Sequence, residues 1–117
     1  EDLRAQILAH GGGYLPSYVG RTEQACNAGA TGCDNAKPVR EYLRTQIFAD
    51  SMVFSDEGLR HLVEEMGATQ VVYGTDMPLG WPDTMDLIIN SNDLTNWEKE
   101  LILGGNLIRL LRIDRTI

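Results

Sequence analysis

Three short apolar runs, each ended by glycine or polar residues, constrain the fold of this chain more than any other feature. They occupy residues 7–9, 47–49 and 71–73. Such runs are typical of strands in a parallel sheet, because helices cover both faces of that kind of sheet. The intervening segments are long enough for helices. The pattern therefore predicts a strand, helix, strand, helix, strand order and an α/β fold.

The clearest predicted helix lies between the second and third runs. Its apolar residues follow the i, i+3, i+4, i+7 spacing of one helix face; they are Leu59, Leu62, Val63 and Met66. Ser55 precedes this stripe as an N-cap candidate, and Gly67 follows it as a helix-ending residue. The segment has a start signal, a buried face and a stop signal in the right order.

Weaker signals predict further helices on either side. We expect a helix over residues 17–26 with Ser17 as its N-cap, a polar loop over 27–37, and a short helix over 38–43. Near the other end, the segment 95–98 has the form of a capping box.

The capping box predicts a helix that continues to Leu103. We expect Gly104 and Gly105 to end it, and Asn106 to cap a last short helix.

Length and charge limit the kinds of protein this chain can be. Its 117 residues, 43% of them hydrophobic, suit one domain or part of one. A net charge of −7 argues against a nucleic-acid partner, and no apolar run approaches the ~18 residues of a membrane span. We expect a soluble, cytoplasmic protein. Because the chain begins at Glu1 rather than Met, we also expect that a preceding segment has been removed.

The two cysteines do not form a metal motif. Cys26 and Cys33 are seven positions apart, and no second pair of ligands completes a zinc site. We predict free thiols. A local disulfide is the alternative, and it requires an oxidising compartment.

Polar side chains stand where each apolar run ends: His10, Asp50 with Ser51, and Asp76. The carboxyl ends of parallel strands meet at one edge of a sheet, so these groups could together bind a metal or move protons. Taken singly, each is more often a turn or capping residue. The glycines after His10 match neither phosphate-loop pattern, which argues against a phosphate site.

Several motifs in one order resemble the amidohydrolase superfamily, in the branch that contains aminocarboxymuconate semialdehyde decarboxylase. The segments are Ala9-His10-Gly11-Gly12-Gly13, Phe48-Ala49-Asp50-Ser51-Met52-Val53-Phe54, Tyr73-Gly74-Thr75-Asp76-Met77-Pro78 and Ile102-Leu103-Gly104-Gly105-Asn106. The similarity implies that residues 1–117 form a single partial domain, covering strands six to eight of a (β/α)₈ barrel and the helices after them.

The resemblance also implies roles for individual residues. Asp76 would ligate a divalent metal, zinc or manganese, and His10 would stand beside that metal and assist catalysis. Arg21 would bind substrate, or else pair with an acidic side chain. In a barrel, the loop that carries Trp81 borders the active site, so Trp81 is a second substrate-binding candidate. The family's other histidine ligands have no counterpart here, because His61 is expected to be a solvated helix residue.

The sequence therefore favours a metal-dependent decarboxylase or hydrolase that takes a small carboxylated aromatic or ring-derived acid. One alternative is a catalytically silent fragment or truncated chain, because a complete barrel needs ~250 residues. Another is a small flavodoxin-like binding module, which also alternates strands with helices. Assembly into homo-oligomers stays open.

Overall fold

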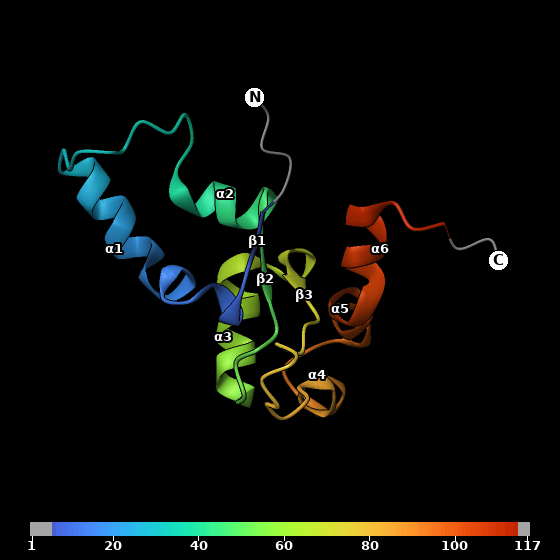
Figure 1. Cartoon of the computed structure of the whole chain (residues 1–117). Coiled ribbons are helices and arrows are strands. Elements are labelled where there is room, and N and C mark those ends of the chain that lie inside the picture. Colours follow the sequence, from blue (N-terminus) through green and yellow to red (C-terminus); the bar gives the residue numbers. More distant parts are fainter. Residues whose placement is uncertain (1–5, 115–117) are drawn as a thin grey trace.

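The computed structural model describes residues 6–114 and contains one parallel sheet of three strands. The strands are β1 (Gln6–Leu8), β2 (Ile47–Asp50) and β3 (Val71–Val72), and β2 lies between the other two (Figure 1). Ile7 pairs with Phe48, and Ala49 pairs with Val71. The three apolar runs predicted as strands are confirmed.

The strand order distinguishes between the two α/β folds considered from the sequence. Each described strand lies beside the next one in the chain, in the order β1, β2, β3. Consecutive strands are neighbours in a (β/α)₈ barrel, whereas a flavodoxin-like sheet begins with the order 2-1-3. The observed order is that of a barrel segment.

Helices fill the connections and pack beside the sheet. They are α1 (Leu15–Asn27), α2 (Val39–Thr45), α3 (Asp56–Met66), α4 (Met85–Asn90), α5 (Asn96–Glu100) and α6 (Asn106–Leu111). Short 3₁₀ turns follow β1 and precede β3, at His10–Gly12 and Ala68–Gln70. In Figure 1, α1 lies to the left of the three strands and α6 to their right. Within the described residues, no helix has the length and apolar character needed to cross a membrane.

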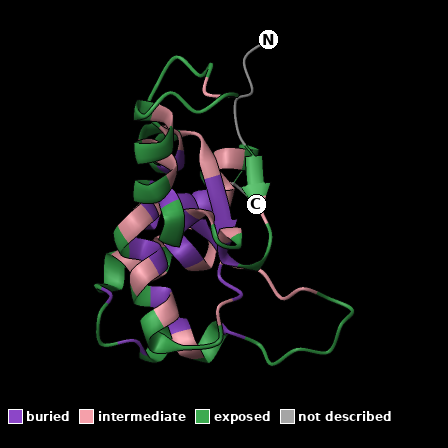
Figure 2. Cartoon of the chain, turned by 90° about the vertical axis from the view of Figure 1, so that its left-hand side faces the viewer, coloured by how far each residue is buried: buried purple, intermediate pink, exposed green. Residues whose placement is uncertain are grey.

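The core forms where the inner faces of the helices meet the strands. Figure 2 shows the buried residues in the middle of the molecule and the exposed ones on the outer helix faces and loops. The largest fully buried apolar side chains are Leu43, Leu59, Met66, Ile88, Ile102, Val19 and Val71. Burying one leucine, isoleucine or methionine contributes about 1.5 to 3 kcal/mol, so this cluster fixes the strands that carry the polar strand ends.

Helix α3 matches its predicted start and end. The Ser55 hydroxyl accepts a hydrogen bond from the Gly58 amide at 3.0 Å. Gly67 ends the helix in a conformation with φ of 85°, which a side chain would disfavour. The capping box is also confirmed, since Thr95 and Glu98 exchange side-chain to backbone hydrogen bonds at the start of α5.

Helix α1 begins earlier than predicted. It starts at Leu15, with Pro16 in its first turn, where a proline amide would have no helical partner in any case. Ser17 is therefore inside the helix, and the prediction that it is the N-cap is wrong. Its hydroxyl instead forms a hydrogen bond with His61 of α3.

The glycine pair near the C-terminus does not end a helix. Residues Leu101–Gly105 form a π-helical turn that joins α5 to α6. Asn106 therefore does not cap a new helix as predicted. Its buried side-chain amide donates hydrogen bonds to the carbonyls of Ala68 and Val71, both at 2.7 Å, and so ties α6 to β3.

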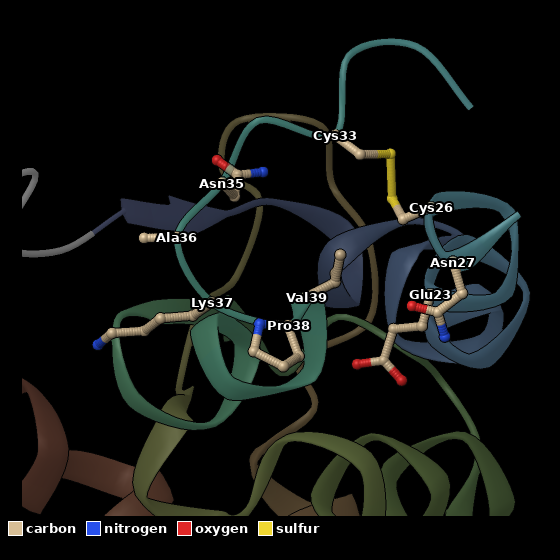
Figure 3. A pocket seen from close by; sticks show the side chains of 9 residues that line it. All are labelled: Glu23, Cys26, Asn27, Cys33, Asn35, Ala36, Lys37, Pro38 and Val39. Carbon is tan, nitrogen blue, oxygen red and sulfur yellow. A yellow bond between two sulfur atoms is a disulfide. The ribbon is translucent and has the colours of Figure 1, made fainter. Parts of the chain in front are cut away.

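The prediction of free thiols is wrong, because Cys26 and Cys33 form a disulfide. Their Cα atoms are 5.6 Å apart, and the bond joins the last turn of α1 to the following loop. Figure 3 shows the disulfide at the wall of a pocket of about 490 Å³, whose other lining includes Glu23 and Lys37. The spacing alone left this alternative open, and the turn after α1 is what brings the two sulfur atoms together.

Candidate active site at the carboxyl edge of the sheet

His10 stands directly after β1, in a backbone turn of unusual conformation. His10, Gly11 and Gly12 have φ values of 57°, 63° and 79°. A residue with a side chain in this left-handed region costs roughly 1–2 kcal/mol, so the surroundings must hold His10 there. A Cβ on Gly11 would lie 2.5 Å from Cγ1 of Val53. Glycine at position 11 lets the turn pack closely against the chain after β2.

Asp76 follows β3 and meets His10 across the edge of the sheet. Its Oδ2 lies 3.4 Å from Nε2 of His10, and the two groups form an ion pair when the imidazole is protonated. The His10 side chain is 65% exposed, whereas that of Asp76 is 22% exposed. The imidazole is thus accessible to a ligand, and the carboxylate is partly buried. Asp76 also has a left-handed backbone, with φ of 53°.

Asp50 and Ser51 end β2 but have different surroundings. The Asp50 carboxylate accepts hydrogen bonds from the backbone amides of His10, Gly11 and Met52. Ser51 is fully buried, and its hydroxyl is 3.1 Å from that of Thr84. Both residues were predicted from the sequence as polar groups at the end of the second strand. The structure places Asp50 beside the His10 turn and gives Ser51 a packing and hydrogen-bonding environment inside the fold.

A groove of about 270 Å³ lies next to His10. It is lined by His10, Gly11, Gly13, Pro16, Ser17, Met52, Val53, Gly58, His61 and Leu62. His61 is half-buried here, and its Nε2 lies 3.0 Å from the Ser17 hydroxyl. The expectation that His61 is simply solvated is wrong. Nothing in the helix pattern could reveal this contact, because it depends on how α1 packs against α3.

Trp81 lies in the loop after Asp76, beside Phe54. The two ring centroids are 6.0 Å apart with the planes tilted by 56°. Both side chains are about half exposed, at 54% for Trp81 and 50% for Phe54. Phe54 follows β2 and Trp81 follows β3, so the pair forms an accessible aromatic surface from two strand-end loops. The sequence analysis singled out Trp81 and missed Phe54.

The loop that carries Trp81 is closed by a pair of polar groups. The Tyr73 hydroxyl is 2.7 Å and 2.8 Å from the two carboxylate oxygens of Asp83, and the Met85 amide donates to the same carboxylate. The hydrogen bond to Asp83 raises the pKa of Tyr73. The Tyr73 and Met85 hydrogen bonds in turn lower the pKa of Asp83. The two hydrogen bonds therefore favour the protonated Tyr73 and the ionised Asp83, and they stabilise the closed loop near neutral pH.

Arg21 lies outside the His10 groove. It is an exposed residue of α1, and it lines a separate shallow pocket with Gln24, Ala25 and Ala28. The structure therefore brings His10 and Asp76 together and places Trp81 on a neighbouring loop. It leaves Arg21 on a different surface.

The side chains at this edge are of types that bind divalent metals, but they are too few for a complete catalytic site. One imidazole and one carboxylate are ordinary ligands of zinc and manganese. A catalytic zinc site normally has three protein ligands, and between residues 6 and 114 no group of three or more His, Cys, Asp or Glu is arranged to hold a metal. The described residues thus do not by themselves complete a catalytic zinc site.

Comparisons with known proteins identify relatives of this chain. No family model matches the chain. A 2-amino-3-carboxymuconate-6-semialdehyde decarboxylase from Dictyostelium discoideum is 38% identical over 111 residues, which cover 92% of this chain and 31% of that protein. The chain spans about a third of the length of the curated relatives it matches.

Solved structures show the same partial match. The IDCase of Metarhizium anisopliae has a TM-score of 0.73 and 28% identity, covering 92% of this chain and 34% of that one. A dihydroxybenzoic acid decarboxylase from Polaromonas has a TM-score of 0.78 at 22% identity, covering 96% of this chain and 35% of that one. The second match supports the fold.

Sequential parallel strands, helical connections and a histidine facing an aspartate at the carboxyl edge together define a segment of a (β/α)₈ barrel. These similarities relate the chain, over about a third of their length, to aminocarboxymuconate semialdehyde decarboxylase and related decarboxylases of the amidohydrolase superfamily. The resemblance stated from the sequence motifs is confirmed.

Proposed function

We propose that this chain is the part of a metal-dependent decarboxylase or hydrolase that contains strands six to eight, and that the enzyme acts on a small carboxylated aromatic or ring-derived acid. The observation that carries the proposal is the 3.4 Å approach of His10 Nε2 to Asp76 Oδ2. Barrel enzymes place their active sites at the carboxyl edge of the strands. The names of its relatives favour decarboxylation as the reaction.

In this proposal, Asp76 is a metal ligand and His10 acts on the substrate. A carboxylate has two oxygens, so Asp76 can face His10 with one and offer the other to zinc or manganese. Manganese is present in the Polaromonas decarboxylase structure, which supports a divalent ion. Such an ion would supply Lewis-acid chemistry when bound. The exposed His10 imidazole can donate a proton or hydrogen bond to a group that develops charge near neutral pH.

The substrate contacts are proposed on different grounds. Trp81, paired with Phe54, offers an aromatic surface on which a planar acid could stack. Arg21 has the charge to bind a substrate carboxylate, but it lies away from the groove, and its assignment rests on the family resemblance alone.

Carbon dioxide release tests the reaction. The chain is incubated with Mn²⁺ or Zn²⁺ and a dihydroxybenzoate or 2-amino-3-carboxymuconate 6-semialdehyde, in wild-type, Asp76→Asn, His10→Gln and Asp34→Asn forms. We expect Asp76→Asn to abolish turnover and His10→Gln to lower kcat about 100-fold or more, since positioned acid-base groups contribute on that scale. Asp34 is exposed in the loop after α1, so its variant should match wild type.

A catalytically silent chain is the second candidate, and the partial coverage of its relatives favours it. It predicts a folded chain without carbon dioxide release and without bound metal. Metal analysis of the purified chain decides the point. Stoichiometric metal that is lost on Asp76→Ala would contradict the silent reading.

We also propose a location and an assembly state for the chain. The chain works in the cytoplasm, and it forms homo-oligomers. Fractionation of cells that produce the chain tests the first, and analytical ultracentrifugation of the purified chain tests the second.

A further inference from the structure

The Asp50 carboxylate makes three backbone hydrogen bonds at the end of β2. Its Oδ2 accepts from the amide of His10 at 3.0 Å. Its Oδ1 accepts from the amide of Gly11 at 2.8 Å and from that of Met52 at 3.0 Å. One side chain therefore joins the turn after β1 to the turn after β2.

The turn that Asp50 holds is one that the chain does not adopt readily. His10 and Gly11 have φ values of 57° and 63°, and a histidine in this region persists only where its surroundings determine the conformation. Hydrogen bonds to a charged acceptor are stronger than those between neutral groups. The Asp50 carboxylate accepts hydrogen bonds from the consecutive amides of His10 and Gly11. It can therefore hold both residues in this backbone conformation.

Asp50 also contacts the segment that leads to Asp76. Its Cα pairs with that of Val72 in the sheet. A Cβ on Gly74 would lie 3.2 Å from Cβ of Asp50 and 3.8 Å from its Oδ2. The chain after β3 therefore passes directly against Asp50, two residues before Asp76, and a side chain at position 74 would crowd the Cβ of Asp50.

We propose that Asp50 is the positioning residue of this site: its carboxylate fixes the His10 backbone so that the imidazole meets Asp76. The catalytic meaning of this inference rests on the proposed function, whereas the positioning itself concerns only the fold of the chain. Asp50 acts through His10 and makes no contact with the reacting groups in this proposal.

Asp50→Asn tests the proposal at nearly constant size. The amide has one acceptor oxygen, so either the His10 amide or the Gly11 and Met52 amides lose their partner, whichever way the side chain turns. Amide hydrogen exchange of the purified chain is the measurement. We expect protection at His10 or Gly11 to fall about tenfold to 100-fold, the scale of one charged hydrogen bond, while amides of α3 keep theirs. Asp34→Asn is the matched control and should change neither.

If Asp50→Asn does not fold, amide exchange of a second variant and of the wild type still tests the proposal. Gly74→Ala retains the carboxylate but crowds the Cβ of Asp50, so the side chain must shift slightly, and protection at His10 and Gly11 should fall by a smaller factor. In the wild type, the Gly11 amide should be protected. Exchange at Gly11 and His10 as fast as in an unstructured peptide would overturn the proposal, as would unchanged local protection in a folded Asp50→Asn variant.

Kinetics separate this inference from the proposed function. Where the wild type turns over substrate, Asp50→Asn should lower kcat and leave KM nearly unchanged, because a misplaced catalytic group weakens the transition state more than binding. An unchanged kcat would overturn the inference. If the wild-type chain shows no turnover, the catalytically silent candidate holds for the isolated chain, and the exchange measurements still confirm or overturn the positioning by Asp50.

Discussion

Two regions of this molecule are ordered by different means. The strand-end rim (residues 10–12, 50–54 and 74–76) is held by contacts between residues far apart in the sequence, such as Asp50 with His10 and His10 with Asp76. The disulfide loop (residues 26–38) is held by contacts between residues close in sequence, among them the disulfide between residues seven apart. The rim depends on the whole fold, whereas the loop depends on a local link.

The difference shows in how each region responds to change. The rim contains left-handed residues packed against neighbouring chain, so an added methyl group disturbs it. The loop is mostly exposed, and a Cβ at Gly29 or Gly32 would meet nothing within 4 Å, although their φ values of 88° and 84° favour glycine. Apart from these two glycines, the loop should tolerate substitutions but respond to reduction of its disulfide. The candidate active site therefore lies in the rim, the region whose packing tolerates added atoms least.

The largest expected effect is that of Gly11→Ala in the rim. The new Cβ would lie 2.5 Å from Cγ1 of Val53. Overpacking together with a left-handed alanine should lower the free energy of unfolding by roughly 2 to 4 kcal/mol, measured by urea denaturation. Gly13→Ala is the control without that contact, since a Cβ added there would meet nothing within 4 Å. Its backbone, with φ of 62° and ψ of −133°, also favours glycine, so this variant should cost about 1 to 3 kcal/mol.

A third variant isolates the packing part of this effect. Val53→Ala removes the atom that Gly11→Ala would meet, so the double variant should lose less stability than the two single losses predict. Equal losses for Gly11→Ala and Gly13→Ala, with no coupling to Val53, would show that backbone conformation alone requires glycine at position 11.

A smaller effect is expected when the disulfide loop loses its bond. Cys26→Ser should lower the free energy of unfolding by about 2 kcal/mol, because closing a short loop restricts the unfolded chain less than closing a long one. Urea denaturation with and without a thiol reductant measures it. The wild type should become less stable on reduction and the variant should not respond. The stabilising role of the disulfide would be refuted if the reductant frees the two thiols of the wild type and the free energy of unfolding does not change.

Local patterns were sufficient to predict the strands and helix α3, whereas the barrel-type fold was predicted from the family resemblance. The apolar runs and the Leu59 stripe are set by residues close together in sequence, and the structure confirms them. The approach of His10 to Asp76 followed from one geometric rule, that parallel strands end at the same edge.

The features that escaped the sequence analysis depend on packing between distant elements. His61 binds Ser17 only because α1 crosses α3, and Asn106 binds the carbonyls before and within β3 only because the π turn carries it there. Asp50 was singled out as a strand-end carboxylate, but its spacing could not show that it binds the amides of His10 and Gly11. These contacts have no local signal.

The smallest expected effect lies in the exposed loop after the rim, where Tyr73 and Met85 lower the pKa of Asp83. A lowered pKa means that the folded state binds this proton less readily than the unfolded state does. The stabilisation is therefore complete above the unfolded value of about 4 and is lost as pH falls through the lower folded value. Asp83→Asn should remove this part of the acid dependence, so in urea titrations the stability difference from wild type should shrink between about pH 5 and about pH 2.

Two controls connect this prediction to the comparison of the regions. Tyr73→Phe removes the hydroxyl but leaves the Met85 amide on Asp83, so it should remove part of the acid dependence. Cys26→Ser should leave it unchanged, because disulfide cysteines do not titrate and the loop is distant in sequence from Asp83. A difference between wild type and Asp83→Asn that stays constant with pH would mean that the carboxylate is not the group responsible. The acid response of the folded chain would then have to come from the other carboxylates.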